Sequence, residues 1–399
     1  MDLLIHPKKL NGRVQVIPSK SQAHRYLICA AFADGPTELR CRAVNRDMDA
    51  TMDCLNALGA EITRTREGYL VKPVRAIPQY AKLPCRDSGS TLRFLLPVAG
   101  ALGVDATFCM EGRLPSRPLS PLWEEMERMG CHLTRPTENT LRCQGKLTSG
   151  TYAIDGGVSS QFITGLLLAL SQVPGQSDIQ LLGTVESRPY IDMTLNAMEA
   201  FGLNIADFHL PDKKSFHSPG MLTVEGDWSN AAFFLAANSL GSQVEITNLN
   251  SHSCQGDRAI AKLLPALNAG IPTISVADIP DLTPILAVTA ALQKGAVFKD
   301  IRRLRLKESD RVETIIRMIT ALGGKARADE ETLTVFGTGL EGGTVDACND
   351  HRIAMAAAIA ATATKHEVTI LGADCVSKSY PEFFQEYRTL GGNYEQYIR

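Results

Sequence analysis

The amino-acid sequence predicts an α/β protein in which six copies of one unit form two domains of three units each. Three features support this prediction. An apolar helical pattern and an amphipathic helical pattern each recur six times, and a short β-like run follows every apolar helix. All three features share a period of about 55–70 residues, and independent features rarely do so by chance.

The apolar helices are expected to form the core. They are rich in Ala, Leu and Ile on nearly all sides, which is typical of buried helices. The predicted segments are 21–35, 90–103, 160–171, 229–241, 283–295 and 351–365. The β-like runs that follow them are 37–41, 105–110, 178–182, 243–247, 296–301 and 367–371.

The amphipathic helices have apolar residues at helical spacing, and each finishes at a glycine suited to the left-handed position after a helix. The predicted segments are 52–59, 122–130, 193–202, 260–270, 312–323 and 383–391. The fourth unit is shorter than the others, and residues 271–281 are expected to lack a hairpin that its sister units contain.

The domain boundary is predicted where residues 225–227 precede the fourth apolar helix. We assign residues 18–225 to the first domain and residues 1–17 plus 226–399 to the second, because the strand before Pro18 would complete a sheet of the second domain. The active-site cleft is expected between the two domains. An open α/β solenoid is the alternative, but the apolar helices carry too little polar surface for it.

Composition argues against several classes of protein. The 399 residues include 41 basic and 43 acidic residues, and this net charge of −2 disfavours a general nucleic-acid-binding surface. No apolar stretch is long enough to span a bilayer and no signal peptide is recognisable, so we expect a soluble cytoplasmic protein. The ten cysteines form no CxxC pair and no cluster with zinc spacing, which predicts reduced thiols and no metal site.

Polar residues collect at the starts of the predicted apolar helices, where free N–H groups attract anions. Residues 19–21 with Arg25 open the first helix, and two glycines precede residues 158–161 at the third. A capping serine would explain either motif alone, and Asp281 is expected to be an ordinary N-cap of the fifth helix. Together the cations near these ends predict a pocket for two small anions. These cations are Lys20, Arg25, Arg117, Arg311, Arg352 and Lys378.

These motifs resemble the 5-enolpyruvylshikimate-3-phosphate synthase family. The similar stretches occur in family order over nearly the whole chain, and they are 19–21 with Arg25, 88–91 with Arg93, 117–118, 158–162, 187–190, 307–311, 349–352 and the Lys378 loop. The resemblance implies two domains of three βαβαββ units, the inside-out α/β barrels of enolpyruvyl transferases. It also implies transfer of the enolpyruvyl group of phosphoenolpyruvate to the 5-hydroxyl of shikimate 3-phosphate, with release of phosphate, in aromatic amino acid biosynthesis.

The resemblance further implies the residues of the site. Shikimate 3-phosphate is expected to contact Lys20, Ser21, Arg25, Ser159, Ser160, Ser187, Asp281 and Lys307, with Tyr190 nearby. Phosphoenolpyruvate is expected to contact Lys20, Gly89, Arg117, Gln161, Arg311, Arg352 and Lys378. Glu308 is expected to move the methylene proton, and Asp281 or Lys20 to take the hydroxyl proton. We expect no metal, no organic cofactor, no nucleic-acid or membrane partner, and a monomer.

The sequence departs from the family pattern near the predicted site. Asp87 replaces a common Asn, Arg86 replaces a small residue, Arg303 stands where an Asn often contacts the shikimate phosphate, and Pro18 joins directly to Ser19 without the usual Gly. These differences leave inhibitor sensitivity open, not the reaction class.

Three other functions fit the sequence less well. The sister enzyme that acts on UDP-N-acetylglucosamine typically has Lys-Asn where this chain has Lys20-Ser21, and a reactive Cys near Arg117, where residues 114–116 contain none. A non-catalytic anion-binding homologue is disfavoured because the three expected catalytic residues are all present. An RNA-end cyclase on a related repeat is disfavoured by the near-neutral net charge.

Overall fold

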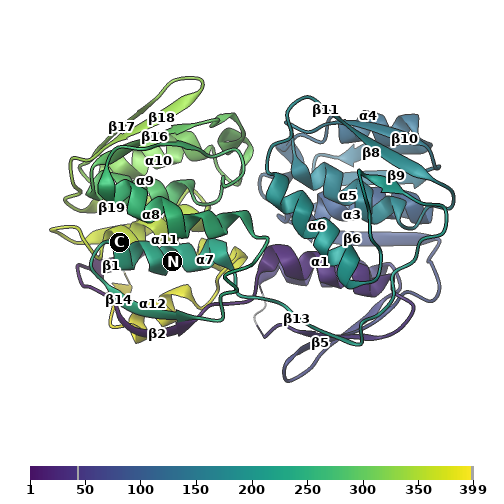
Figure 1. Ribbon diagram of the computed structural model, residues 1–399, viewed down its shortest axis with the longest axis horizontal. Coiled ribbons are helices and arrows are strands. Elements are labelled where there is room, and N and C mark those ends of the chain that lie inside the picture. The colour runs from purple at the N-terminus through teal and green to yellow at the C-terminus, as the bar shows by residue number, and fades with distance from the viewer. Residues whose placement is uncertain (43–44, 397–399) are drawn as a thin grey trace. The chain divides into compact units, whose positions relative to one another are not determined.

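The structure is a computed structural model that describes residues 1–42 and 45–396. It is a mixed α/β protein, so the predicted fold class is confirmed (Figure 1). The chain divides into two compact units, Pro18–Val224 and Met1–Ile17 with Glu225–Arg399. They are called the continuous unit and the split unit below. In the described ranges, no helix has both the length and the apolar composition needed to cross a membrane.

Three apolar helices contribute most of the core of the continuous unit. They are α1 (Lys20–Ala31), α3 (Gly89–Leu102) and α5 (Ser160–Leu170). Their side chains are buried on nearly every face, which the apolar composition predicts. The amphipathic helices of this unit are α2 (Arg46–Ala57), α4 (Leu122–Arg128) and α6 (Arg188–Ala200).

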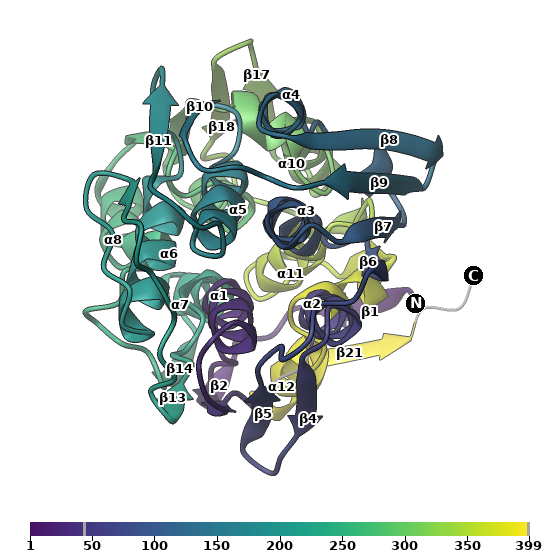
Figure 2. The same ribbon diagram turned by 90° about the vertical axis from the view of Figure 1, so that its right-hand side faces the viewer.

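The described strands of the continuous unit form three sheets, with the orders β13–β3–β5–β4, β6–β7–β9–β8 and β10–β11–β12. In each sheet the first pair is parallel and the other pairs are antiparallel. Figure 2 shows α1, α3 and α5 close to end-on, with strands of these sheets outside them. The strands are β3 (Thr37–Arg40), β4 (Glu61–Arg64), β5 (Gly68–Lys72), β6 (Tyr80–Arg86), β7 (Asp105–Met110), β8 (Cys131–Thr137), β9 (Thr140–Gly145), β10 (Thr151–Asp155), β11 (Ser177–Leu182), β12 (His209–Leu210) and β13 (Met221–Thr223).

The split unit follows the same plan. Its apolar helices are α7 (Trp228–Ser239), α9 (Thr283–Leu292) and α11 (His351–Ala360), and its amphipathic helices are α8 (Ile260–Ala269), α10 (Arg311–Ala321) and α12 (Phe383–Thr389). Its sheets have the orders β14–β2, β15–β16–β18–β17 and β19–β20–β1–β21. The strands are β1 (Leu3–His6), β2 (Asn11–Gln15), β14 (Gln243–Thr247), β15 (Thr273–Ser275), β16 (Gly295–Lys299), β17 (Lys325–Ala328), β18 (Thr332–Phe336), β19 (Gly343–Asp346), β20 (Val368–Leu371) and β21 (Asn393–Gln396).

The chain passes between the units twice, and each time it leaves a strand of one unit to enter an apolar helix of the other. Strand β2 ends at Gln15 and α1 begins at Lys20, whereas β13 ends at Thr223 and α7 begins at Trp228. Strand β2 pairs with β14, and β13 pairs with β3, both in parallel. A hydrogen bond joins the two connecting segments, because the Asp227 amide donates to the Ile17 carbonyl oxygen at 2.9 Å.

Every helix and strand that the sequence predicts has a counterpart, but several ends differ. The helix predicted over 351–365 ends at Ala360. Threonine hydroxyls there compete with backbone amides for carbonyl groups. The Thr362 hydroxyl donates to the Ile359 carbonyl oxygen, and the Thr364 hydroxyl donates to the His366 carbonyl oxygen. In the fourth unit, residues 271–281 contain only the short strand β15, which joins the sheet of β16. Strand β14 of the same unit lies in a sheet of two strands.

Helices α3 and α5 approach each other closely at Gly165. A Cβ atom on Gly165 would lie 2.2 Å from the Arg93 carbonyl oxygen and 2.8 Å from Pro97 Cγ, so only glycine fits without a shift of backbone. This contact sets the positions of Arg93 and of the first turn of α5, both of which belong to the candidate site described next.

We expect Gly165→Ala to destabilise the protein by about 1–3 kcal/mol, because the added methyl group must push the two helices apart. Gly270→Ala is the control, since a Cβ there meets no atom within 4 Å. Calorimetric unfolding of both variants measures the difference. Equal melting temperatures for the two variants would contradict the close approach.

Candidate active site

The first part of the candidate site lies at the N-terminus of α1 in the continuous unit. Ser19 caps the helix by accepting from the Gln22 amide, which leaves Lys20 as the first helical residue. The Lys20 ammonium donates to Asp47 Oδ2 at 2.9 Å, and both side chains are about 15% exposed or less. Asp47 lies in the first turn of α2 and therefore holds Lys20 in place.

The second part surrounds the N-terminus of α3. Gly89 is the first residue of α3, and a Cβ there would lie 2.6 Å from Arg117 Nη1, so the glycine makes room for the Arg117 guanidinium. Arg93 donates to Gln161 Oε1 at 2.8 Å, and the Gln161 amide donates to Ser90 at 3.0 Å. Three residues that are expected to contact phosphoenolpyruvate therefore lie close together around the first turn of α3. They are Gly89, Arg117 and Gln161.

The expected phosphate-binding serines lie at the starts of α5 and α6. Ser159 caps α5 and Ser160 is its first residue, and both are buried. Ser187 precedes α6 in a left-handed conformation with φ of 57°, which non-glycine residues adopt rarely and which often marks a functional constraint. The Glu186 amide donates to the Gly156 carbonyl oxygen at 3.2 Å and so joins the two loops. The loop before Ser187 is thus bonded to the loop before Ser159 and Ser160, and a helix starts after each of them.

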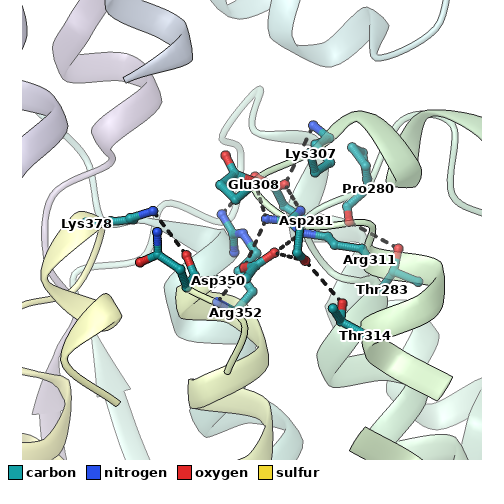
Figure 3. A network of polar contacts seen from close by, with 12 residues as sticks. Pro280, Asp281, Thr283, Lys307, Glu308, Arg311, Thr314, Asp350, Arg352 and Lys378 are labelled. Atoms are coloured by element: carbon teal, nitrogen blue, oxygen red, sulfur yellow. Dashed lines mark hydrogen bonds and ion pairs between the residues drawn. The ribbon is translucent and has the colours of Figure 1, made fainter. Parts of the chain in front are cut away.

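The split unit contains a network of ion pairs centred on Asp281 and Arg311 (Figure 3). The two Asp281 oxygens accept from Arg311 Nη1 at 2.7 Å and from Arg352 Nη2 at 2.8 Å. The Lys307 ammonium lies 3.9 Å from Asp281, and Arg311 Nη2 donates to Glu308 at 2.8 Å. All five residues were expected from the sequence, and the structure brings them together.

The expected role of Asp281 as an N-cap is wrong. Helix α9 begins at Thr283, its N-cap position is Leu282, and no side chain caps it. Asp281 lies one residue too early, and its carboxylate pairs with the two buried guanidinium groups instead. A charged partner stabilises a buried arginine more than a cap stabilises one helix end, so the tertiary contact prevails.

Lys378 lies near this network, in the 3-10 helix Ala373–Lys378 before α12. Its ammonium donates to the Asn349 carbonyl oxygen at 3.1 Å, and the residue is buried (Figure 3). Asn349 precedes Asp350, the N-cap of α11, and Arg352 lies in the first turn of that helix, so Lys378 bonds close to the start of α11.

The comparisons with known proteins identify the family. A family model described as EPSP synthase (3-phosphoshikimate 1-carboxyvinyltransferase) matches residues 5–387. Relatives with the name 3-phosphoshikimate 1-carboxyvinyltransferase from Clostridium kluyveri and Clostridium perfringens are each 35% identical to this chain, over 98% of the chain and 98% of the relative.

This chain belongs to the EPSP synthase family. A solved structure of EPSP synthase from Acinetobacter baumannii covers 99% of this chain and 100% of its own, with a TM-score of 0.80 and 21% identity. At that identity the likeness supports the fold, while the Clostridium relatives and the family model support the family.

Asp350 belongs to the candidate site, although it was not among the site residues expected from the sequence. It caps α11 by accepting from the Arg352 amide, and it accepts from Arg311 Nε at 2.9 Å and from the Ser309 hydroxyl at 2.9 Å. Its side chain is fully buried. The signal was available, because Asp350 stood beside a buried Arg352 in an apolar helix start, and a buried cation needs a carboxylate.

The charges of the network shift the acid–base properties of its members. Burial raises the pKa of Asp281, but the Arg352, Lys307 and Arg311 charges outweigh that effect and hold the pKa well below its usual value. Burial lowers the pKa of Lys307 to about 8, although Asp281 opposes this shift. Within the described residues no group of three or more His, Cys, Asp or Glu side chains is arranged to hold a metal ion.

We expect Asp350→Asn to lower the free energy of unfolding by about 3 kcal/mol or more, because it leaves the Arg311 guanidinium under-compensated in the core. Glu341→Gln is the control, since the Glu341–Lys365 pair is exposed and should contribute less than about 1 kcal/mol. Denaturant unfolding measures both changes. A loss in the control as large as that in Asp350→Asn would contradict this account.

Proposed function

We propose that this protein transfers the enolpyruvyl group of phosphoenolpyruvate to the 5-hydroxyl of shikimate 3-phosphate and releases phosphate. The observation that carries the proposal is the network of Asp281, Glu308 and Arg311, which combines two carboxylates for proton transfer with buried cations for the anionic substrates. The relatives named 3-phosphoshikimate 1-carboxyvinyltransferase support the same reaction.

Shikimate 3-phosphate is proposed to bind through its phosphate to Ser159, Ser160 and Ser187. These serines lie at helix N-termini, where backbone N–H groups and the helix dipole favour a phosphate. Ser21, Arg25, Lys307 and Asp281 are proposed to hold the remainder of this substrate.

Phosphoenolpyruvate carries a carboxylate and a phosphate, and guanidinium groups pair with both in a bidentate manner. Its proposed partners in the continuous unit are Lys20, Gly89, Arg117 and Gln161. Its proposed partners in the split unit are Arg311, Arg352 and Lys378.

The proposed reaction proceeds by addition and elimination. Glu308 donates a proton to the methylene carbon while the 5-hydroxyl oxygen forms a bond to the adjacent carbon, and Asp281 or Lys20 takes the hydroxyl proton. Glu308 then takes a proton back from the methyl group of this tetrahedral intermediate, while the bond between the adjacent carbon and the phosphate oxygen breaks and phosphate leaves. The surrounding cations stabilise the negative charge throughout.

The depressed pKa of Asp281 bears on its role as a base. In the free protein its two oxygens are occupied by Arg311 and Arg352, which makes the carboxylate a weak base. An anionic substrate that binds the same guanidinium groups would draw them away from Asp281 and raise its pKa. The base would therefore be strengthened when the substrate is present.

The decisive assay measures phosphate release from phosphoenolpyruvate with shikimate 3-phosphate, without it, and with UDP-N-acetylglucosamine in its place. We expect release only with shikimate 3-phosphate. Release with the nucleotide sugar would support the sister activity, and binding without release would support a non-catalytic homologue. A cytoplasmic monomer is proposed as well, and sedimentation tests the oligomeric state.

We expect Glu308→Gln to lower kcat by about 10²–10⁴-fold while the Kd of shikimate 3-phosphate changes little, because the amide cannot supply the proton. Glu313→Gln, on the exposed face of α10, is the matched control and should keep full activity. Turnover and calorimetric titration give the two quantities. Normal turnover in Glu308→Gln would exclude the proposed proton transfer.

The lowered pKa of Lys307 predicts that the activity depends on pH. An amine is charged below its pKa, so with a pKa of about 8 Lys307 loses its charge as the pH rises through that value. We expect kcat/KM for shikimate 3-phosphate to fall between about pH 7.5 and 9.5, and Lys307→Arg to remove most of this fall because arginine stays charged. Profiles of the same shape in both proteins would argue against Lys307 as the titrating group.

A further inference from the structure

A buried hydrogen-bond network of the continuous unit surrounds Arg25, a proposed ligand of shikimate 3-phosphate, and includes two threonines with no role assigned so far. The Arg25 side chain is among the largest fully buried ones in the described chain. Its Nε donates to Thr194 Oγ1 at 2.8 Å and its Nη1 to the Ser21 carbonyl oxygen at 2.6 Å. Its Nη2 donates to the Tyr190 carbonyl oxygen at 2.8 Å and to Thr164 Oγ1 at 3.3 Å.

The two threonine hydroxyls complete this cluster. Thr194 donates its single proton to the Tyr190 carbonyl oxygen at 3.0 Å, and the Thr164 and Thr194 hydroxyl oxygens are 2.7 Å apart. Thr194 thus accepts from Arg25 and shares a hydrogen bond with Thr164, and both threonines are fully buried.

The cluster joins three helices near their N-termini. Arg25 and the Ser21 carbonyl belong to α1, Thr164 to α5, and Thr194 with Tyr190 to α6. Thr164 lies one turn after Ser160, and Tyr190 lies in the first turn of α6. A shift of the cluster would move these first turns directly, because a helix is stiff over one turn.

We propose that Thr164 and Thr194 are positioning residues, which hold Arg25 so that the N-termini of α1, α5 and α6 keep the arrangement needed to bind a phosphorylated substrate. The threonines act through Arg25. This inference rests on the proposed function, in which the serines at these three N-termini bind shikimate 3-phosphate.

Thr194→Val tests the inference, since valine keeps the shape and removes the hydroxyl. It leaves the Arg25 Nε–H group without its acceptor in a buried place, and the guanidinium must shift. We expect KM for shikimate 3-phosphate to rise about tenfold and to rise more than KM for phosphoenolpyruvate, because proposed shikimate 3-phosphate ligands lie at all three N-termini whereas none of the proposed phosphoenolpyruvate ligands lies at that of α6. Thr194→Ser keeps the hydroxyl and should restore KM. Thr164→Val should act in the same direction but less strongly, because its contact with Arg25 is longer.

Thr289→Val is the matched control. Thr289 is fully buried in α9, and its hydroxyl donates to the Ile285 carbonyl oxygen at 2.9 Å, four residues earlier, as that of Thr194 does to Tyr190. No arginine bonds to it among the described contacts. A KM increase in Thr289→Val, or a failure of Thr194→Ser to restore KM, would overturn the inference, because either result indicates a general loss of stability.

Amide hydrogen exchange tests the positioning without any turnover. In Thr194→Val we expect faster exchange in the first turns of α1, α5 and α6 and unchanged exchange in α9 and α11. If the wild-type protein releases no phosphate in the presence of shikimate 3-phosphate, the proposed function is refuted. Amide exchange and direct titration of shikimate 3-phosphate would still decide whether Thr194 has the positioning role. Unchanged exchange and unchanged affinity in Thr194→Val would refute it.

Discussion

The burial of the Arg311 guanidinium is the constraint that organises the candidate site of the split unit. A buried guanidinium is costly by several kcal/mol unless carboxylates surround it, and Arg311 meets three of them, Asp281, Glu308 and Asp350. These carboxylates come from three separate segments, the loop before α9, the turn before α10 and the start of α11. Pairing with one side chain therefore draws three segments together and fixes the geometry of the network.

The repeated architecture explains why functional groups collect at helix ends. The sides of the apolar helices are packed inside a core, so a polar side chain there would have to be satisfied in full. Only the first turn is free of this restriction, and it also offers unpaired N–H groups. Ser159 and Ser160 on α5 and Arg352 on α11 occupy such first turns. Periodicity therefore predicts where function can be located before any chemistry is considered.

Much of the fold followed from the sequence, because the apolar and amphipathic patterns are local and recur. The partners of the charged residues did not follow. Asp350 pairs with Arg311, 39 positions away, and Asp47 pairs with Lys20, 27 positions away. No local sequence pattern indicates such a pairing. The mistaken capping role of Asp281 has the same origin, since the capping rule considers only the neighbouring residues and two distant guanidinium groups determined the outcome.

Arg25 and Arg311, two of the buried arginines, bond to different kinds of acceptor. The four hydrogen bonds of Arg25 go to neutral oxygens, two hydroxyls and two carbonyls, whereas Arg311 bonds to carboxylates. Neutral acceptors stabilise a guanidinium but leave its charge uncancelled, while carboxylates cancel it. The contacts around Arg25 tie the first turns of α1, α5 and α6 to one another. The contacts around Arg311 instead gather carboxylates from three segments of the split unit at one point.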